Sequence, residues 1–156
     1  MIAADVDPAA VEENYLETRL RKDDGLLPLV LDLTNPPGAG GWAHEERPGF
    51  FERMPRDTAM ALALIHHLAI SNNVPLLRLA HFFHRICKHL IIEFIPKSDS
   101  QVQRLLRSRE DIFEDYDEPN FRQSFARYFD IKFSCSIEGS ERSLYLMQAK
   151  DDTGER

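Results

Sequence analysis

The sequence predicts an α/β protein with a mostly parallel sheet, helices on both of its faces and an antiparallel hairpin at the carboxyl end. Two observations lead to this fold class. Apolar runs of strand length alternate with segments of helical period, which is the pattern of parallel strands joined by helices. The last two strand-like segments have only a short turn between them, and strands joined in this way pair antiparallel.

The first third of the chain contains two expected strands with a helix between them. Residues 1–5 form an apolar strand, and Asp7 then supplies the N-cap of a helix that runs over about 8–22, with proline at its first position. An Asp-Asp-Gly stretch ends that helix. The next apolar run, 26–32, is the second strand, because it is apolar on both faces as buried parallel strands are.

The remaining segments continue the alternation of strands and helices. The expected ranges are a short helical turn at 49–54, strands at 58–64, 89–95, 131–137 and 143–149, and helices at 75–87, 101–109 and 120–129. The turn of the closing hairpin is Glu138-Gly139-Ser140. We therefore expect one domain over residues 1–150, followed by a frayed polar tail over 151–156.

The composition disfavours several classes of protein. Lys and Arg number 19 against 26 Asp and Glu, a net charge of −7, whereas proteins that bind a nucleic-acid backbone carry the opposite balance. No apolar run reaches the roughly 18 residues that a membrane span requires, and no signal peptide opens the chain. Two cysteines far apart make no disulfide scaffold. We expect a cytoplasmic protein without nucleic-acid or membrane partners.

Two acidic residues follow the first two strands. Asp5 and Asp32 stand at the carboxyl ends of these strands, where open α/β sheets bind ligands. A carboxylate at Asp5 can accept hydrogen bonds from both hydroxyls of a ribose; the alternative is a helix N-cap, a role that Asp7 fills better. A carboxylate at Asp32 can accept a hydrogen bond from an amine such as that of adenine. The alternative for Asp32 is a turn held by its own side chain, which taken alone it fits better.

Three further titratable residues follow the third and fourth strands. His66 and His67 fit packing in a turn better than metal binding, and a role as pocket wall or general base is intermediate. We expect no resident metal, although a metal hydrolase that uses both histidines is an alternative that predicts bound zinc. Glu93 lies near the end of a buried strand, where a carboxylate is costly unless paired. Its expected partner is Lys97, Arg109 or a substrate.

These segments together resemble the class I S-adenosylmethionine-dependent methyltransferases. Residues 4–8 are similar to the family's second-strand motif, 31–33 to its third-strand motif, and 61–68, with its paired histidines, to its fourth-strand motif. The closing hairpin is similar to the family's antiparallel sixth and seventh strands. The resemblance implies a Rossmann-like three-layer sandwich.

A narrower resemblance spans nearly the whole chain. Five blocks are similar to a bacterial group of nodulation-protein-related methyltransferases: residues 27–30, 41–42, 66–70, 93–99 and 142–147. This resemblance implies an enzyme that transfers the methyl group of S-adenosylmethionine to an acceptor by in-line displacement, driven mainly by positioning. It names no acceptor.

The resemblance also implies roles for particular residues in binding the cofactor. Asp5 would bind the ribose hydroxyls, and Val6 would pack on adenine. Asp32 would bind the adenine amine, with Leu33 lending its backbone.

A second set of roles concerns the transfer site. Ala63 and Leu64 would border the methyl group as part of the cofactor site, with His66 close by. Glu93 and the loop that leads to Asp99 would face the substrate. His66 and Glu93 are therefore the candidate catalytic residues.

One motif of the family has no counterpart in the sequence. The family's first motif is a glycine-rich turn after its first strand, and the only glycine cluster here, 38–41, follows the third-strand motif. We therefore expect the chain to lack the first βα unit, so that methyl transfer would require a missing amino-terminal part. The alternative is a non-catalytic, methyltransferase-like remnant that serves as an interaction module. A strand left unpaired by the missing unit would be an open sheet edge, which favours a homodimer.

Overall fold

The computed structural model describes residues 1–54, 56–107 and 110–151. The chain divides into two compact units, Met1–Phe50 and Phe51–Arg156, and each unit contains a sheet of its own. The elements follow one another as the sequence predicts, and the α/β class is confirmed. Beyond Asp151, the tail expected to fray lies outside the described residues.

The first unit is built on a pair of parallel strands. β1 (Ile2–Asp5) and β2 (Leu27–Val30) pair in parallel, with Asp5 opposite Val30, and α1 (Pro8–Arg21) joins them. As predicted, Asp7 caps α1, because its carboxylate accepts a hydrogen bond from the Ala9 N–H at 2.9 Å. The residue that ends the helix was wrongly expected to be glycine: Lys22 takes the left-handed conformation, with φ 54°.

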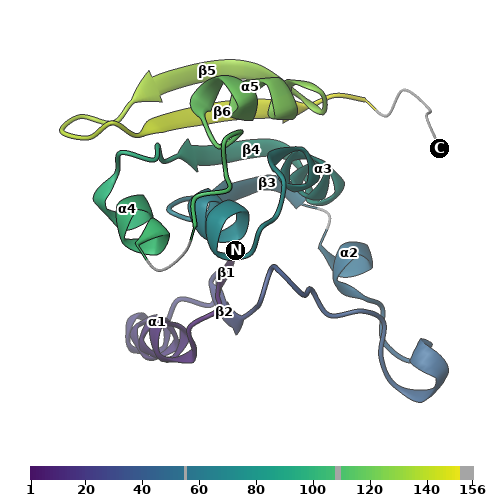
Figure 1. Ribbon diagram of the computed structural model, residues 1–156. Coiled ribbons are helices and arrows are strands. Elements are labelled where there is room, and N and C mark those ends of the chain that lie inside the picture. Colours follow the sequence, from purple (N-terminus) through teal and green to yellow (C-terminus); the bar gives the residue numbers. More distant parts are fainter. Residues whose placement is uncertain (55, 108–109, 152–156) are drawn as a thin grey trace. The chain divides into compact units, whose positions relative to one another are not determined.

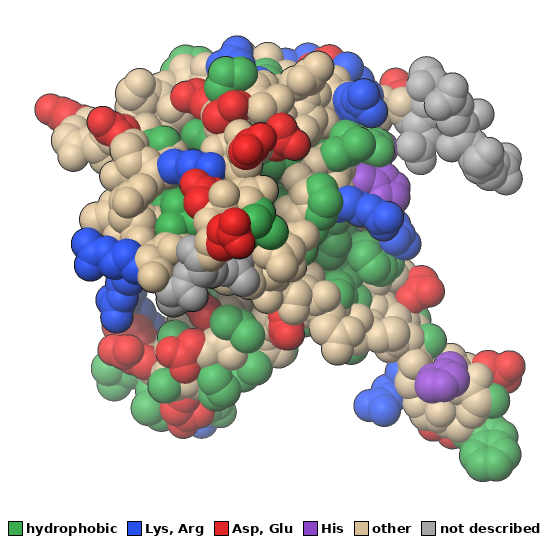
Figure 2. All heavy atoms as spheres, in the orientation of Figure 1, with side chains coloured by type: hydrophobic (Ala, Val, Ile, Leu, Met, Phe, Trp, Pro, Cys, Tyr) green, Lys and Arg blue, Asp and Glu red, His purple; other side chains and the backbone are tan. Residues whose placement is uncertain are grey.

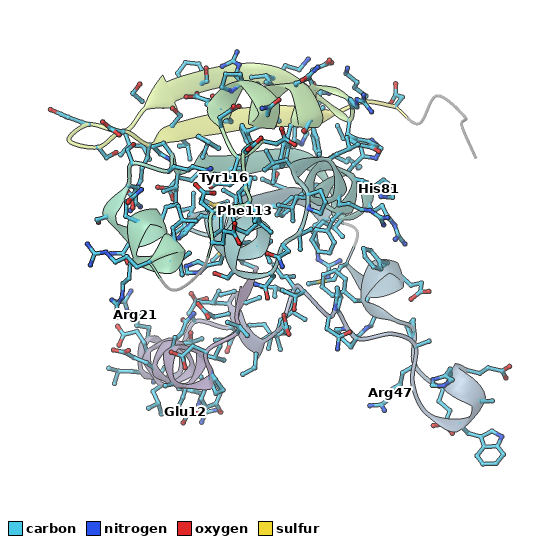
Figure 3. The ribbon with its side chains drawn as sticks, viewed as in Figure 1. Glu12, Arg21, Arg47, His81, Phe113 and Tyr116 are labelled. Atoms are coloured by element: carbon cyan, nitrogen blue, oxygen red, sulfur yellow. The ribbon has the colours of Figure 1, made fainter. Side chains whose placement is uncertain are left out.

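No side chain of α1 is fully buried. Val11, Asn14 and Thr18, which share one face of the helix, are half-buried, and its other residues are exposed. Figure 3 shows Glu12 and Arg21 pointing away from the helix among other exposed side chains. A short 3₁₀ turn, η1 (Trp42–His44), and the single-turn helix α2 (Phe50–Arg53) follow β2.

The second unit contains a four-stranded mixed sheet (Figure 1). Its strands are β3 (Arg56–Ala61), β4 (Cys87–Phe94), β5 (Phe129–Ser136) and β6 (Ser143–Ala149). They lie in the order β3-β4-β6-β5, with β3 and β4 parallel and β6 antiparallel to both of its neighbours. The predicted closing hairpin is therefore confirmed, and β6 returns to the middle of the sheet.

Helices connect these strands. They are η2 (His67–Ser71), one turn of π-helix that the sequence did not predict, α3 (Leu76–Ile86), α4 (Ser100–Leu106) and α5 (Glu118–Ala126). α4 ends earlier than expected, and Arg109, the predicted end, lies outside the described residues. β3 also ends earlier than the predicted strand 58–64, because Ala63 turns into the left-handed region, with φ 49°.

Aromatic side chains fill the core of the second unit. Phe121 is fully buried, and its ring centroid lies 4.5 Å from that of Phe125 and 5.1 Å from those of Phe94 and Tyr145. Tyr116 lies beside β4 (Figure 3), and its hydroxyl donates a hydrogen bond to the Ile95 carbonyl at 2.9 Å. α5 and the segment before it are thereby fixed to the carboxyl end of β4.

An apolar row crosses the sheet of the second unit on its more exposed side. Met60, Ile91, Leu146 and Phe133 stand opposite one another across the four strands. Met60 and Phe133 are 62% and 61% exposed, whereas the residues on either side of Ile91 and Leu146 in the sequence are buried in the core.

Among the described residues, no helix is long and apolar enough to cross a membrane.

Candidate functional site

A group of polar side chains gathers where β3 and β4 end. We call His66, Glu93, Asp99 and Arg142 the Glu93 cluster. Glu93 lies on β4, one residue before the strand ends, and is 7% exposed. A buried carboxylate requires partners, because the transfer of an unpaired charge from water into the protein costs roughly several kcal/mol.

Both oxygens of Glu93 have partners. Oε2 accepts a hydrogen bond from the Ala63 N–H at 2.6 Å, and Oε1 lies 3.2 Å from a guanidinium nitrogen of Arg142. Glu93 thus holds the left-handed residue that turns the chain from β3 towards His66. The partners expected from the sequence are different: Lys97 pairs with Asp111 at 2.9 Å, and Arg109 lies outside the described residues.

Arg142 connects three separate segments of the second unit. It precedes β6 in the closing hairpin, and besides Glu93 it binds Asp99, with 2.8 Å between Nε and Oδ2. Asp99 also caps α4, because its other oxygen accepts from the Gln101 N–H at 2.8 Å. The hydrogen bond from Arg142 lowers the pKa of Asp99, and the same bond raises the pKa of Arg142. Both shifts favour the charged forms of Asp99 and Arg142, so this ion pair persists near neutral pH.

His66 is the neutral member of the cluster. Its side chain is 2% exposed, and burial lowers its pKa to about 4, with further lowering by His67 and Arg142. The ring centroids of His66 and His67 lie 4.1 Å apart, with 40° between the ring planes. Among the described residues, Nδ1 of His66 has no hydrogen-bond partner. A buried, unpaired ring nitrogen is costly, so it marks a place where a bound group would supply the missing bond.

The first unit contains two carboxylates at the carboxyl ends of β1 and β2: Asp5 is the last residue of β1, and Asp32 comes two residues after β2. Oδ1 of Asp5 accepts from the Asp7 N–H at 2.9 Å, and Oδ1 of Asp32 accepts from both the N–H and the hydroxyl of Thr34, at 2.8 and 2.6 Å. These bonds lower the pKa of Asp32. The turn expected as the alternative role of Asp32 is therefore present. Both side chains are exposed, and the second oxygen of Asp5 has no hydrogen-bond partner among the described residues.

The predicted site residues fall into two sets, one in each unit. Within Met1–Phe50, the parallel pairing places Asp5 and Asp32 at the carboxyl ends of neighbouring strands, with Val6 64% exposed and Leu33 half-buried. Within Phe51–Arg156, Ala63 and Glu93 are hydrogen-bonded, and His66 follows close behind. The Leu64 carbonyl accepts from the His67 N–H at 3.0 Å and so continues this turn.

Sequence reasoning missed the central role of Arg142. The residue appears only as the first position of the block 142–147, and nothing in its local pattern indicates an ion pair with β4. The strand register supplies that information, because Phe94 stands opposite Ser143 and so brings the preceding arginine next to the end of β4. The metal-hydrolase alternative finds no support in the described part of the chain, where no three metal-ligating side chains come together.

Solved structures define the class of fold. The chain superposes on the PH0226 protein from Pyrococcus horikoshii with a TM-score of 0.60 and 13% identity, over 96% of this chain and 71% of the other. It matches a protein from Sulfolobus solfataricus, assigned as a type 11 methyltransferase, with a TM-score of 0.54 and 15% identity, over 99% and 73%. The bifunctional kinase-methyltransferase WbdD gives 0.59 and 11%, over 94% and 29%. The chain therefore has a Rossmann-like methyltransferase fold.

The sequence is also similar to that of a nodulation protein. The nodulation protein NoeA of Rhizobium meliloti is 38% identical over 150 residues, which cover 96% of this chain and 31% of NoeA. The resemblance to nodulation-related proteins is thereby confirmed, and the chain spans about a third of the length of this relative. No known family profile matches the sequence.

Proposed function

We propose that this chain is part of an S-adenosylmethionine-dependent methyltransferase that transfers a methyl group to an acceptor. The observation that carries the proposal is the pair of exposed carboxylates, Asp5 and Asp32, at the carboxyl ends of neighbouring parallel strands of a methyltransferase fold. Ligands of open α/β sheets bind at this end of the strands. The two carboxylates fit an adenosine group, because each is exposed and can accept hydrogen bonds from its hydroxyl or amino groups.

The residues of the first unit would bind and orient the adenosine part of the cofactor. The free oxygen of Asp5 would accept hydrogen bonds from the ribose, while the hydrogen bond from Asp7 keeps the carboxylate in place. The exposed Val6 side chain would cover one face of adenine. Asp32, already oriented by Thr34, would accept from the adenine amine, and the backbone of Leu33 would lie at the ring edge.

The residues of the second unit would shape the place of methyl transfer. S-adenosylmethionine, when bound, supplies an electrophilic methyl group on a sulfonium. Ala63 and Leu64 would border this methyl group, in a turn that Glu93 holds through the Ala63 N–H. Because both oxygens of Glu93 already have protein partners, we assign it a positioning role.

His66 would contact the acceptor through Nδ1, the nitrogen without a partner in the described structure. With a pKa of about 4 it is neutral at physiological pH and a weak base. It therefore suits one hydrogen bond that orients the attacking atom, and we propose this role in place of proton abstraction. Orientation of that kind is a large part of catalysis when a reaction is driven by positioning.

A calorimetric titration of the protein with S-adenosylmethionine tests the proposal. Asp5→Asn removes a charge-assisted acceptor for the ribose and should weaken binding by about ten- to a hundredfold. Asp24→Asn is the matched control, because it removes the same charge from another exposed position of the same unit and should leave the affinity unchanged.

Two results would favour the non-catalytic alternative. One is a wild-type titration that gives neither heat nor a thermal shift, together with a gene that encodes no glycine-rich segment upstream. The other is equal affinity in wild type and Asp5→Asn, which would restrict Asp5 to its turn.

A further inference from the structure

A second polar site lies at the opposite end of the four-stranded sheet. A cavity of about 610 Å³ opens where β3 and β4 begin and where β6 ends. Cys87 in its lining and Glu93 stand at opposite ends of β4, about 20 Å apart at a rise of about 3.3 Å per residue. The cavity is therefore separate from the Glu93 cluster.

Cations gather round this cavity, against the net charge of −7 of the whole chain. The lining includes four basic side chains and two carboxylates: Arg56, Arg85, Lys88 and Lys150, with Asp57 and Asp151. His84 and His89 also line it and add further hydrogen-bond donors. In Figure 2, blue side chains lie at the edge of the second unit beside α3. Placing four cations together costs repulsion that an anion would relieve.

The contacts of these cations hold them in place without neutralising them all. Lys88 lies 2.9 Å from Asp57, but both side chains are more than 70% exposed, so this ion pair is weak. The guanidinium carbon of Arg85 lies 3.7 Å from the ring centroid of Phe51. This cation–π contact holds the guanidinium against the ring, and within the described residues no carboxylate forms an ion pair with it.

The backbone at the end of β6 completes the lining. Lys150 donates a hydrogen bond from its ammonium to the Ala126 carbonyl, and its own carbonyl oxygen lies 2.8 Å from Nε2 of His84. Because a carbonyl only accepts, this nitrogen of His84 carries its proton. These bonds link the end of α3 to the segment that follows β6, beside the start of β4, so that the three segments surround the cavity.

We propose that this cavity binds the phosphate or pyrophosphate group of a small anionic ligand. Arg85 offers a planar fork of donors and Lys88 a mobile point charge, the two kinds of group that bind phosphate oxygens. The volume lies within the range of small-molecule sites. The site does not depend on the methyltransferase proposal, because none of its lining residues has a role there.

Titration of the ¹⁵N-labelled protein with inorganic pyrophosphate tests the site by NMR, with ionic strength held constant. We expect saturable amide shifts centred on residues 84–89 and 148–151, the segments that line the cavity. Arg85→Gln combined with Lys88→Gln should weaken binding at least tenfold. Lys132→Gln, an exposed lysine on β5 that is paired with Asp130, should not change it.

A parallel titration with adenosine 5′-diphosphate distinguishes the source of the phosphate groups. Equal affinity for the two ligands supports a site for the phosphates alone, and tighter binding of the diphosphate supports a nucleotide site. Shifts scattered over all basic residues, or the same weakening in Lys132→Gln as in the double variant, would overturn the proposal, because binding would then be non-specific.

Discussion

The two units of the chain differ in how their residues are buried. In Met1–Phe50, all of which the structure describes, only Gly49 and Phe50 are buried. In the described part of Phe51–Arg156, aromatic and aliphatic side chains form a continuous core around Phe121. The first unit carries exposed carboxylates suited to a ligand, and the second carries a polar cluster fixed by partly buried ion pairs.

This difference indicates a division of tasks between stability and binding. Burial of apolar surface is the main source of folding free energy, so we expect the second unit to supply most of it. A pair of strands that binds a ligand but has no buried core is expected to unfold locally at a low cost in free energy. The predictions that follow test this contrast, from the largest expected effect to the smallest.

The largest effect is expected from a core substitution in the second unit. Phe121→Ala removes a fully buried ring that contacts three other aromatic rings, and should lower the free energy of unfolding by about 3–5 kcal/mol. Leu16→Ala on α1, where the side chain is 58% exposed, should change it by less than about 0.5 kcal/mol. Urea unfolding followed by circular dichroism measures both. Similar decreases in the free energy of unfolding in the two variants would show that side-chain packing in the first unit contributes as much stability as the core of the second.

An intermediate effect is expected from acid, through His66. Its pKa falls from 6.5 to about 4 on folding, so between these values the unfolded chain binds a proton that the folded chain does not. The contribution of His66 therefore leaves the free energy of unfolding unchanged above pH 6.5 and lowers it towards pH 4, by about 3 kcal/mol in total. His66→Gln should flatten this part of the stability profile measured by urea unfolding at several pH values. An unchanged slope in the variant would mean that other groups cause the acid sensitivity.

The smallest effect compares two helix caps. Asp7 caps α1 in the first unit and Asp117 caps α5 in the second, each through its own carboxylate. Replacement of either by alanine should cost about 1 kcal/mol. We expect Asp117→Ala to lower the global unfolding free energy, and Asp7→Ala to speed hydrogen exchange within residues 8–21 only. Faster exchange throughout the chain in Asp7→Ala would show that the two units unfold together.

The sequence predicted the fold well where local chemistry decides it. The cap at Asp7, the hairpin turn around Gly139, with φ 74°, and the core face of α3 all follow from local signals. The exposure of α1 does not follow, because periodicity shows which face is apolar and not what covers it. The early end of β3 depends on the left-handed Ala63, a conformation that alanine does not favour by itself.

The candidate site was predicted less completely than the fold. Asp5, Asp32, His66 and Glu93 are candidates because strand ends in α/β sheets are where ligands bind. Their states were not predictable, since the burial of His66 and the pairing of Glu93 depend on contacts between distant segments. Arg142 shows this best: its partners lie 43 and 49 residues away in the sequence, on the far side of α5.

The attachment of Arg142 to two acidic partners constrains how the length of this chain can change in evolution. Residues inserted at the hairpin tip near Gly139, where a side chain would meet nothing within 4 Å, leave Arg142 and β6 in place. A single residue inserted between Arg142 and Ser143 would displace the arginine from the strand register that carries it to Glu93. Homologues that keep this ion pair should therefore vary in length before Arg142 and keep a fixed spacing after it.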